Sequence, residues 1–242
     1  MKTIAIFGAG PALGLAVARR FGREGFQVAL VARNPEHLDA LAAELARDGV
    51  TAAGFPADFT DREATLAATD AIEARFGPID VLEYNPGGGG DWQRRAPEID
   101  VATAAALLEV TILTPVALVG RVLPGMLERG DGGLLFAQGG SAKYPVPHLG
   151  SASLAQPGLR GYVHTLHADL APKNVYAGTL LIGALIEGTP AHRNASAWSG
   201  GDQSLPVVTA ADLADRLWGM YFKRDRPEDE VTQSRSVLAE RG

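Results

Sequence analysis

Short apolar runs alternate with amphipathic segments of helix length along most of the chain. Residues 3–7 and 25–32 are apolar runs of strand length, and residues 15–21 between them have a helical pattern. A glycine-rich turn, residues 8–14, joins the first run to the helical segment. This order predicts a strand–turn–helix–strand unit with two parallel strands.

The alternation continues through most of the remaining chain. Further strands are predicted over residues 50–55, 79–84, 134–137 and 175–182, and helices over residues 35–48, 61–76, 101–129, 159–170 and 210–222. Pro115 and Pro124 are expected to bend or interrupt the third of these helices, and Pro145 and Pro147 to keep residues 144–148 out of a helix. The charged tail after residue 222 predicts no element.

No linker or internal repeat divides the sequence, so one domain is expected over residues 1–242. Strands that alternate with helices predict an α/β fold: a single-domain, Rossmann-like, doubly wound parallel sheet with helices on both faces. Residues 1–137 are expected mainly to bind a cofactor, and residues 138–242 mainly to form a substrate pocket. Within the second half, residues 187–206 lack periodicity and are expected to form a mobile loop over a site.

Composition narrows the class of protein. A chain with 46% hydrophobic and 21% charged residues has the balance of a folded domain, and a formal net charge of −6 argues against nucleic acid as a partner. The absence of cysteine excludes disulfides and thiol nucleophiles. His164 and His167 have no third ligand nearby, so no metal site is predicted. The N-terminus enters a strand almost directly, and no apolar stretch is expected to reach membrane-spanning length, so we expect a cytoplasmic protein with no membrane partner.

The glycine-rich turn is suited to a phosphate. It lies between a strand and a helix, where a pyrophosphate can sit against free main-chain N–H groups at the positive end of the helix. Gly8 allows the tight turn, Gly10 removes a side chain from the path of the phosphate, and Gly14 lets the helix pack closely on the strand. A dinucleotide cofactor is therefore predicted.

The end of the second strand favours NADP(H) over NAD(H). A free ribose 2′-hydroxyl usually meets an Asp or Glu about 20 residues after the glycines, whereas a 2′-phosphate is met by Arg. Residues 27–34 contain no acid, and Arg33 directly follows the strand. The alternative for Arg33 is an ordinary solvent-facing loop residue.

Polar and glycine residues follow the ends of four predicted strands: Asp58, Asn85, Gln138 and Gly183. Ligands of doubly wound sheets bind beyond the carboxyl ends of the strands. We therefore expect these residues to gather around one crevice.

With these features the chain resembles a short-chain dehydrogenase/reductase over most of its length. The family's Thr-Gly-x-x-x-Gly-x-Gly is matched by residues 7–14, with Ala12 in place of the middle glycine. Asp58 resembles the acid that hydrogen-bonds adenine, residues 85–87 resemble the Asn-Ala-Gly that closes the cofactor groove, and Gly183 follows the strand that ends near the nicotinamide. The resemblance implies these cofactor-binding residues: Gly8, Gly10, Ala12, Leu13, Gly14, Arg33, Asn34, Asp58, Phe59, Asn85, Pro86, Gly87 and Gly183.

The catalytic half departs from the family pattern. Members commonly use an Asn, a Ser, a Tyr and a Lys, in which the Tyr exchanges a proton with the substrate and the Lys lowers its pKa. Aligned without gaps on residues 159–170, those four positions hold Thr111, Gly139, Ala152 and Gln156. A shift by two residues places Gly150 and Leu154 at the Tyr and Lys positions instead, and restores neither.

Two other residues are candidates for the missing acid or base. Tyr144 and His148 lie in the segment expected to border the nicotinamide, and a histidine titrates near neutral pH. The alternative is that Pro145 and Pro147 simply stiffen a pocket wall.

Three functions remain open from the sequence. The first is an NADP(H)-dependent oxidoreductase with a displaced proton donor, acting on an unidentified small organic substrate. The second is a non-redox isomerase, lyase or cyclase on the same scaffold, and the third is a non-catalytic NADP(H)-binding sensor or partner. The resemblance and the low charge of residues 101–129 and 151–170 also imply a homodimer or homotetramer.

Overall fold

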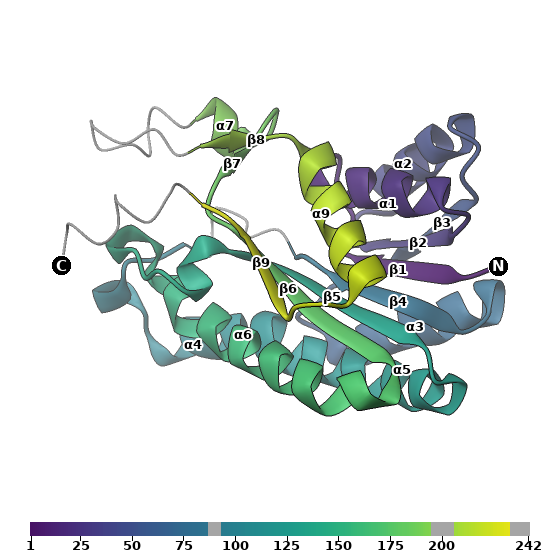
Figure 1. Ribbon diagram of the computed structural model, residues 1–242. Coiled ribbons are helices and arrows are strands. Elements are labelled where there is room, and N and C mark those ends of the chain that lie inside the picture. Colours follow the sequence, from purple (N-terminus) through teal and green to yellow (C-terminus); the bar gives the residue numbers. More distant parts are fainter. Residues whose placement is uncertain (87–92, 195–205, 233–242) are drawn as a thin grey trace.

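The computed structural model describes residues 1–86, 93–194 and 206–232, without the side chain of His148. Seven strands form one sheet in the order β3-β2-β1-β4-β5-β6-β9, and all their pairings are parallel (Figure 1). The strands are β1 Thr3–Phe7, β2 Gln27–Ala32, β3 Ala52–Pro56, β4 Ile79–Tyr84, β5 Gly132–Gly139, β6 Val175–Ile182 and β9 Glu228–Val231. The predicted α/β doubly wound fold is confirmed.

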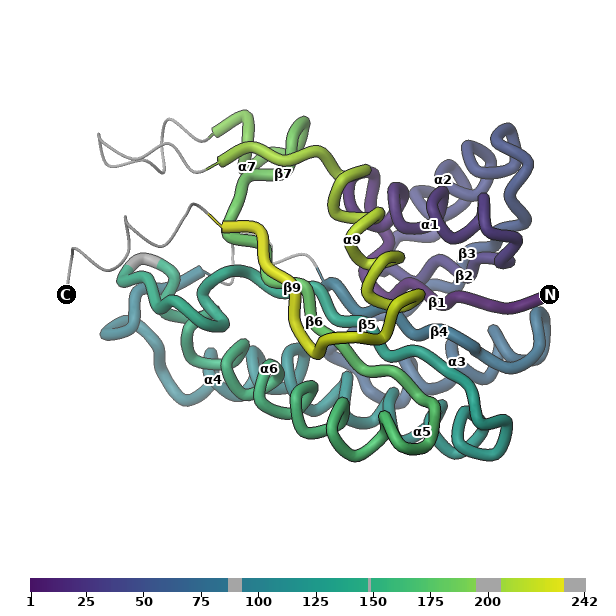
Figure 2. The backbone as a smooth tube through the Cα atoms, viewed as in Figure 1, coloured from purple at the N-terminus to yellow at the C-terminus, as the bar shows by residue number. Residues whose placement is uncertain are grey.

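Helices cover both faces of the sheet, as the tube in Figure 2 also shows. One layer consists of α1 Leu13–Arg23, α2 Pro35–Arg47 and α9 Ala210–Lys223. The other consists of α3 Arg62–Phe76, α5 Thr114–Arg129 and α6 Gly150–Leu170, with α4 Val101–Leu108 preceding α5. Beyond the carboxyl ends of the strands lie α7 Pro190–Arg193 and a small pair of strands, β7 Leu185–Ile186 and β8 Val207–Val208.

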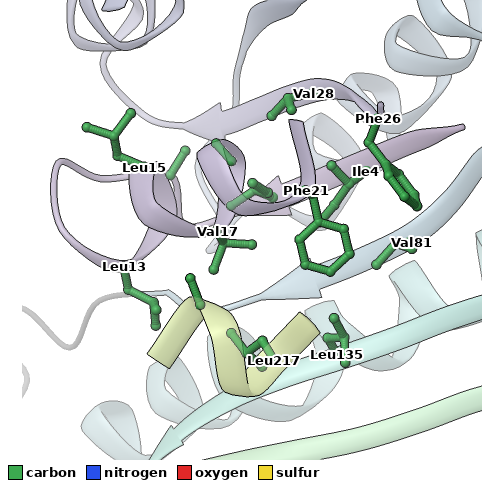
Figure 3. Close-up of a cluster of buried hydrophobic side chains, with 14 of the residues drawn as sticks. Ile4, Leu13, Leu15, Val17, Phe21, Phe26, Val28, Val81, Leu135 and Leu217 are labelled. Carbon is green, nitrogen blue, oxygen red and sulfur yellow. The ribbon is translucent and has the colours of Figure 1, made fainter. Parts of the chain in front are cut away.

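Two apolar cores lie on opposite faces of the sheet, because successive side chains of a strand alternate in direction. In β1, Ile4 and Ile6 face α1 and α9, whereas Ala5 and Phe7 face the other helical layer. Phe21 of α1 is completely buried in the first core, near Phe26 (Figure 3). Its ring packs edge-on against the rings of Phe26 and Trp218. This packing ties α1 to α9, although the two helices are far apart in sequence.

The third predicted strand is observed at 52–56 rather than 50–55, and the fifth is longer than predicted, at 132–139. The helix predicted over 159–170 begins at residue 150, and Pro157 lies inside it. The expectation that residues 144–148 are not helical was wrong in part, since Pro147–Leu149 forms one 3₁₀ turn. A proline at the first position of a helical turn loses no hydrogen bond, because that N–H has no partner within the turn.

Residues Val101–Arg129 form one continuous helix, despite two prolines. A π-helical segment, Glu109–Leu113, ends two residues before Pro115 and accommodates this proline, while Pro124 lies inside α5. The expectation that no apolar stretch reaches membrane-spanning length was wrong: by length and composition this helix is apolar enough to cross a membrane, and an 18-residue window within it has a mean hydropathy of 1.9. Its α5 part packs on the sheet through residues such as Leu118 and Val122.

The edge strand β9 was missed in the sequence because its residues are mostly acidic. Glu228 on this strand accepts hydrogen bonds from Arg160 Nε at 2.5 Å, His164 Nε2 at 3.0 Å and Lys143 Nζ at 3.1 Å. Burial opposes ionisation of the carboxyl, but these three bonds outweigh it and lower the pKa of Glu228 to about 2. The acid therefore fastens β9 to α6 through charge rather than through apolar packing.

We predict that Glu228→Gln lowers the free energy of unfolding at pH 7 by about 1–2 kcal/mol, a value reduced for solvent screening. Because the folded pKa is depressed, the contribution of Glu228 is complete above about pH 4.5 and is lost as the pH falls through about 2. Urea unfolding of both proteins between pH 7 and pH 2.5 measures the difference. The exposed Glu63→Gln serves as the control. A difference between Glu228→Gln and wild type that stays constant with pH would contradict this account.

Candidate cofactor groove and active site

The carboxyl ends of the central strands are joined by main-chain hydrogen bonds. Asn85 N after β4 donates to Phe7 O at 2.8 Å, and Gly8 N after β1 donates to Val31 O at 2.9 Å. Ala57 N after β3 donates to Ala32 O at 3.0 Å. The segments that follow β1, β2, β3 and β4 therefore meet along one edge of the sheet.

The glycine-rich turn is held in a conformation that only glycine adopts easily. Gly8 has a φ of 110°, and a Cβ there would lie 2.4 Å from Asn85 O. A Cβ on Gly14 would lie 2.8 Å from Ala9 Cα, so this glycine permits the close packing of α1 against the turn. Both glycines are required by the fold itself, before any ligand is considered.

The N-terminus of α1 is left open for an anion. Its N-cap residue is Ala12, whose methyl side chain cannot accept a hydrogen bond, so Leu13 N and Gly14 N keep their capacity to donate, whereas Leu15 N donates to Gly10 O at 2.9 Å. The N-termini of α2, α3 and α9 are instead capped by the side chains of Asn34, Asp61 and Thr209. A Cβ on Gly10 would meet nothing closer than Gly8 O at 4.0 Å, so space remains over this turn. The residues present therefore fit a bound pyrophosphate.

Arg33 and Asp58 lie on neighbouring segments at one end of this groove. Arg33 is exposed, and its charge contributes to lowering the pKa of Asp58, after hydrogen bonds from the main-chain N–H and the hydroxyl of Thr60. Asn34 accepts from His37 N and so caps α2, and the ring of Phe59 is buried in the second core. The side chains of Asn34 and Phe59 thus have structural roles already.

The remaining predicted cofactor residues lie farther along the groove. Pro86 is half-buried beside Asn85, whereas Gly87 lies outside the described residues. Gly183 N donates to Val231 O at 2.7 Å, and its Cα is 3.0 Å from a Cβ position on Gly140. The ends of β5 and β6 are therefore in close contact.

Residues from β5 and α6 meet where the sequence alignment placed the catalytic groups. A Cβ on Gly139 would lie 3.1 Å from Gln156 Oε1 and 3.5 Å from Ser141 Oγ. The Ser141 hydroxyl donates to Gln156 Oε1 at 3.2 Å. Ala152, one turn before Gln156, is half-buried. The Gln156 amide therefore occupies space beside Gly139 that a side chain at position 139 would need.

Thr111 lies in the π-helical segment of the long helix and is half-buried. This segment is anchored from the sheet, because the Tyr84 hydroxyl at the end of β4 donates to Val110 O. Thr114 Oγ1 also donates to Phe59 O at 2.8 Å. These contacts fix the segment relative to the strand ends.

Tyr144 is turned toward the edge strand β9. Its hydroxyl is 3.4 Å from each carboxylate oxygen of Glu230, and Lys143 Nζ donates to the same carboxylate at 2.7 Å. His148 lies in the 3₁₀ turn, and its side chain is outside the described residues. The roles of Tyr144 and His148 as acid or base stay predictions.

The sequence reading missed the most unusual ionisable group near the groove, Glu83 in β4. Its side chain is completely buried, and both carboxylate oxygens accept from Asn85 Nδ2, at 2.6 and 2.7 Å. Burial raises the pKa of Glu83 to about 8, and the hydrogen bonds from Asn85 oppose part of that rise. An acid inside the apolar run 79–84 was the signal available in the sequence.

A pocket of about 620 Å³ lies apart from the glycine-rich turn. It is lined by the start of α4 and the start of α6, including Val101, Ala104, Pro147 and Leu154. Of the described residues that line it, none is among the predicted cofactor residues. Val101 and Leu154 are exposed, so this pocket is open to solvent.

Comparison with known proteins identifies the family. Residues 2–199 match the short chain dehydrogenase family. A fatty acyl-CoA reductase of Mycobacterium tuberculosis is 30% identical over 231 residues, which are 93% of this chain and 74% of that protein. The chain therefore belongs to the short-chain dehydrogenase/reductase family.

Solved structures share the fold along nearly the whole chain. An actinorhodin polyketide ketoreductase solved with NADPH has a TM-score of 0.85 at 24% identity, covering 96% of this chain and 95% of that one. An NADPH-bound short chain oxidoreductase of Pseudomonas aeruginosa PAO1, described as containing an atypical catalytic center, has a TM-score of 0.83 at 21% identity, with 98% and 97% covered. At these identities the likeness concerns the fold.

We predict that Gly10→Ala weakens nucleotide binding with little effect on stability, whereas Gly8→Ala destabilises the fold. Gly10→Ala should leave the free energy of unfolding within about 0.5 kcal/mol of wild type, because its Cβ meets open space, yet weaken nucleotide binding. Gly8→Ala should cost about 2–5 kcal/mol, because a positive φ and a clash with Asn85 add together.

The control is Gly49→Ala, which has a φ of 78° and no atom within 4 Å of its Cβ position. Gly49→Ala should lower the free energy of unfolding by only about 1–2 kcal/mol, the cost of a positive φ for a residue with a Cβ. Thermal melting and nucleotide titration of the three variants test both predictions. A Gly10→Ala protein that binds NADPH as wild type does would contradict the placement of the phosphates.

Proposed function

We propose that this protein is an NADP(H)-dependent oxidoreductase that acts on an unidentified small organic substrate, with the usual catalytic residues of its family replaced. The observation that carries the proposal is the open N-terminus of α1 beneath a glycine-rich turn, with Arg33 at the end of the neighbouring strand. Family membership and the NADPH-bound structures of the same fold support the choice of cofactor.

In this proposal each part of the groove holds a part of the cofactor. The main chain of residues 8–14 binds the pyrophosphate, Arg33 meets the 2′-phosphate, and Asp58 lies beside the adenine. Oδ2 of Asp58 accepts a hydrogen bond from the adenine, because Oδ1 already accepts hydrogen bonds from Thr60. NADP(H), when bound, supplies hydride chemistry, and the chain's own task is to position and surround it.

We predict that NADP(H) binds more tightly than NAD(H) and that Arg33→Ala removes the preference. Loss of one charge-assisted contact to the 2′-phosphate should cost about 1.5–3 kcal/mol, which is about 10- to 150-fold in Kd. NAD(H) has no such phosphate, so its affinity should be unchanged.

Fluorescence titration of both nucleotides onto wild type and Arg33→Ala makes the measurement. Arg47→Ala, at the exposed end of α2, is the matched control for the loss of one positive charge. Equal affinities of the wild type for the two nucleotides would count against the proposal.

In the proposed catalytic centre, the two positions that usually hold the Tyr and the Lys carry no group that transfers a proton. In the ungapped alignment the usual Tyr and Lys are replaced by Ala152 and Gln156, and neither side chain donates a proton near neutral pH. Contact between Gln156 and Gly139 supports this alignment over the shifted one, since Leu154 is 48% exposed on the outer face. The Ser141 hydroxyl already donates its hydrogen to Gln156 Oε1, so the amide N–H groups of Gln156 are the donors that can bind and polarise a substrate oxygen without protonating it.

We predict little or no turnover of simple ketones and secondary alcohols by the wild type. Loss of one positioned acid or base typically removes a factor of about 10²–10⁴ in rate. Activity, where found, should depend on a substrate that supplies its own acidity or on a substitute such as Tyr144 or His148. The substrate panel should begin with fatty acyl-CoA thioesters, because the relative from Mycobacterium tuberculosis is a fatty acyl-CoA reductase.

The measurement is nicotinamide absorbance with wild type, Tyr144→Phe and His148→Ala. Ser153→Ala is a control in the same segment that removes a hydroxyl. Fast reduction of generic ketones by the wild type, with neither variant slower, would show that this description of the site is wrong.

A non-redox enzyme or a non-catalytic NADP(H)-binding sensor is the second candidate. This candidate is favoured by the absence of Tyr and Lys from positions 152 and 156. Nucleotide binding without turnover across the panel distinguishes it from the first.

The assembly and location complete the proposal. The outer face of α4, α5 and α6 exposes the apolar side chains of Val101, Leu108, Leu113, Val116 and Leu154. The exposure of these side chains supports the proposed homodimer or homotetramer, in which a second copy would bury them. The cytoplasmic location and the absence of a membrane partner stay predictions.

A further inference from the structure

The buried acid Glu83 is not used by the chemistry proposed above. It lies one residue before the carboxyl end of the central strand β4, where its register partners are Ile6 of β1 and Leu135 of β5. Alternation along β4 places its side chain on the same face as Val81, toward α1 and α9. Its exposed fraction is 0%, so water does not stabilise its charge.

Charged groups of the surrounding elements do not compensate it. The residues of α1 and α9 that face the sheet are apolar, among them Val17, Leu213 and Leu217. The charged side chains near that layer form ion pairs with one another: Arg19 with Glu44 and Asp48, Arg20 with Glu24 and Asp215, Arg216 with Asp229, and Lys2 with Asp131. Among the described residues, Asn85 is the one polar partner of Glu83.

Asn85 connects the buried carboxyl to the glycine-rich turn. Its amide nitrogen is bonded to Glu83, while its Oδ1 lies 2.6 Å from the Cβ position of Gly8. Its main-chain N also donates to Phe7 O, the residue before the turn. The Asn85 amide therefore stands between the acid and the turn proposed to hold the pyrophosphate.

The protonation state of the acid decides what this amide presents to the turn. An ionised carboxylate only accepts, so it holds Asn85 Nδ2 and leaves Oδ1 toward Gly8. A neutral carboxyl can also donate its O–H to Oδ1, which lets the amide turn its N–H groups toward the turn. An uncompensated negative charge below the turn would, in addition, repel a bound phosphate through a medium of low dielectric constant.

We infer that Glu83 is a positioning residue of the nucleotide groove and that the groove binds its anionic nucleotide with this carboxyl in the neutral form. The inference rests on the proposed binding of NADP(H) at the glycine-rich turn. In a protein molecule whose Glu83 is ionised, the carboxylate takes up one proton from the buffer as the nucleotide binds. The nucleotide itself is chemically unchanged. The affinity for NADPH is then linked to pH.

The test is the pH dependence of NADPH binding from pH 7.5 to 9.5, where the cofactor's phosphates are already ionised. If only the neutral form binds, the Kd of the wild type rises about 25-fold over this range, given a Glu83 pKa of about 8. Glu83→Gln, which keeps the shape and cannot ionise, should change less than about twofold. Glu63→Gln, an exposed acid on α3, should behave as the wild type.

A second measurement detects the proton directly. Calorimetric titration at pH 9 in buffers of different ionisation enthalpy should show about one proton taken up per NADPH by the wild type and none by Glu83→Gln. Circular dichroism and thermal melting establish that the variant is folded.

Three results would overturn the inference, and they can be told apart. Equal pH dependence in wild type and Glu83→Gln overturns it and leaves the proposed cofactor intact. Loss of NADPH binding at every pH by a folded Glu83→Gln shows that the carboxylate itself is required, and so overturns the neutral form. Failure of the wild type to bind NADPH at any pH overturns both this inference and the proposed function.

Discussion

The contact between the glycine-rich turn and the end of β4 is the constraint on which the cofactor groove depends. The chain turns sharply at Gly8 with a positive φ, and Asn85 lies so close that no side chain fits between them. Main-chain hydrogen bonds from Asn85 to Phe7 and from Gly8 to Val31 hold the ends of three strands in one plane. Because these bonds use backbone groups, they fix the groove independently of the side chains that later bind a ligand.

Around this contact the two halves of the domain meet different requirements. On the α1 side, an uncapped helix and an open glycine leave donors and space for an anion. On the α6 side, position 139 is a glycine, and the Gln156 amide lies in the space that a side chain there would need. Gln156 Oε1 accepts a hydrogen bond from the Ser141 hydroxyl. The first half thus keeps the features of a dinucleotide site, while in the second the Gln156 amide is held beside the end of β5.

Charge is distributed in two contrasting ways near the groove. At the sheet edge, Glu228 is surrounded by three basic groups, which hold it ionised and attach β9 to α6. In the sheet centre, Glu83 has a neutral amide as its partner, and burial favours its neutral form. A glutamate therefore joins two elements through ion pairs at the sheet edge, whereas in the sheet centre a glutamate is buried in an environment that favours its protonated form.

The sequence by itself determined the layered fold and the position of the groove. The alternation of apolar runs with helical segments depends on local spacing, and the glycines at residues 8–14 act through their own backbone. Tertiary structure alone decided the rest. β9 forms because Glu228 finds basic partners 64 to 85 residues away, α6 extends to residue 150 across Pro157, and a π-helical segment accommodates Pro115. The partners of Glu83 and Gln156 likewise come from burial and from neighbouring strands and helices, which no local pattern encodes.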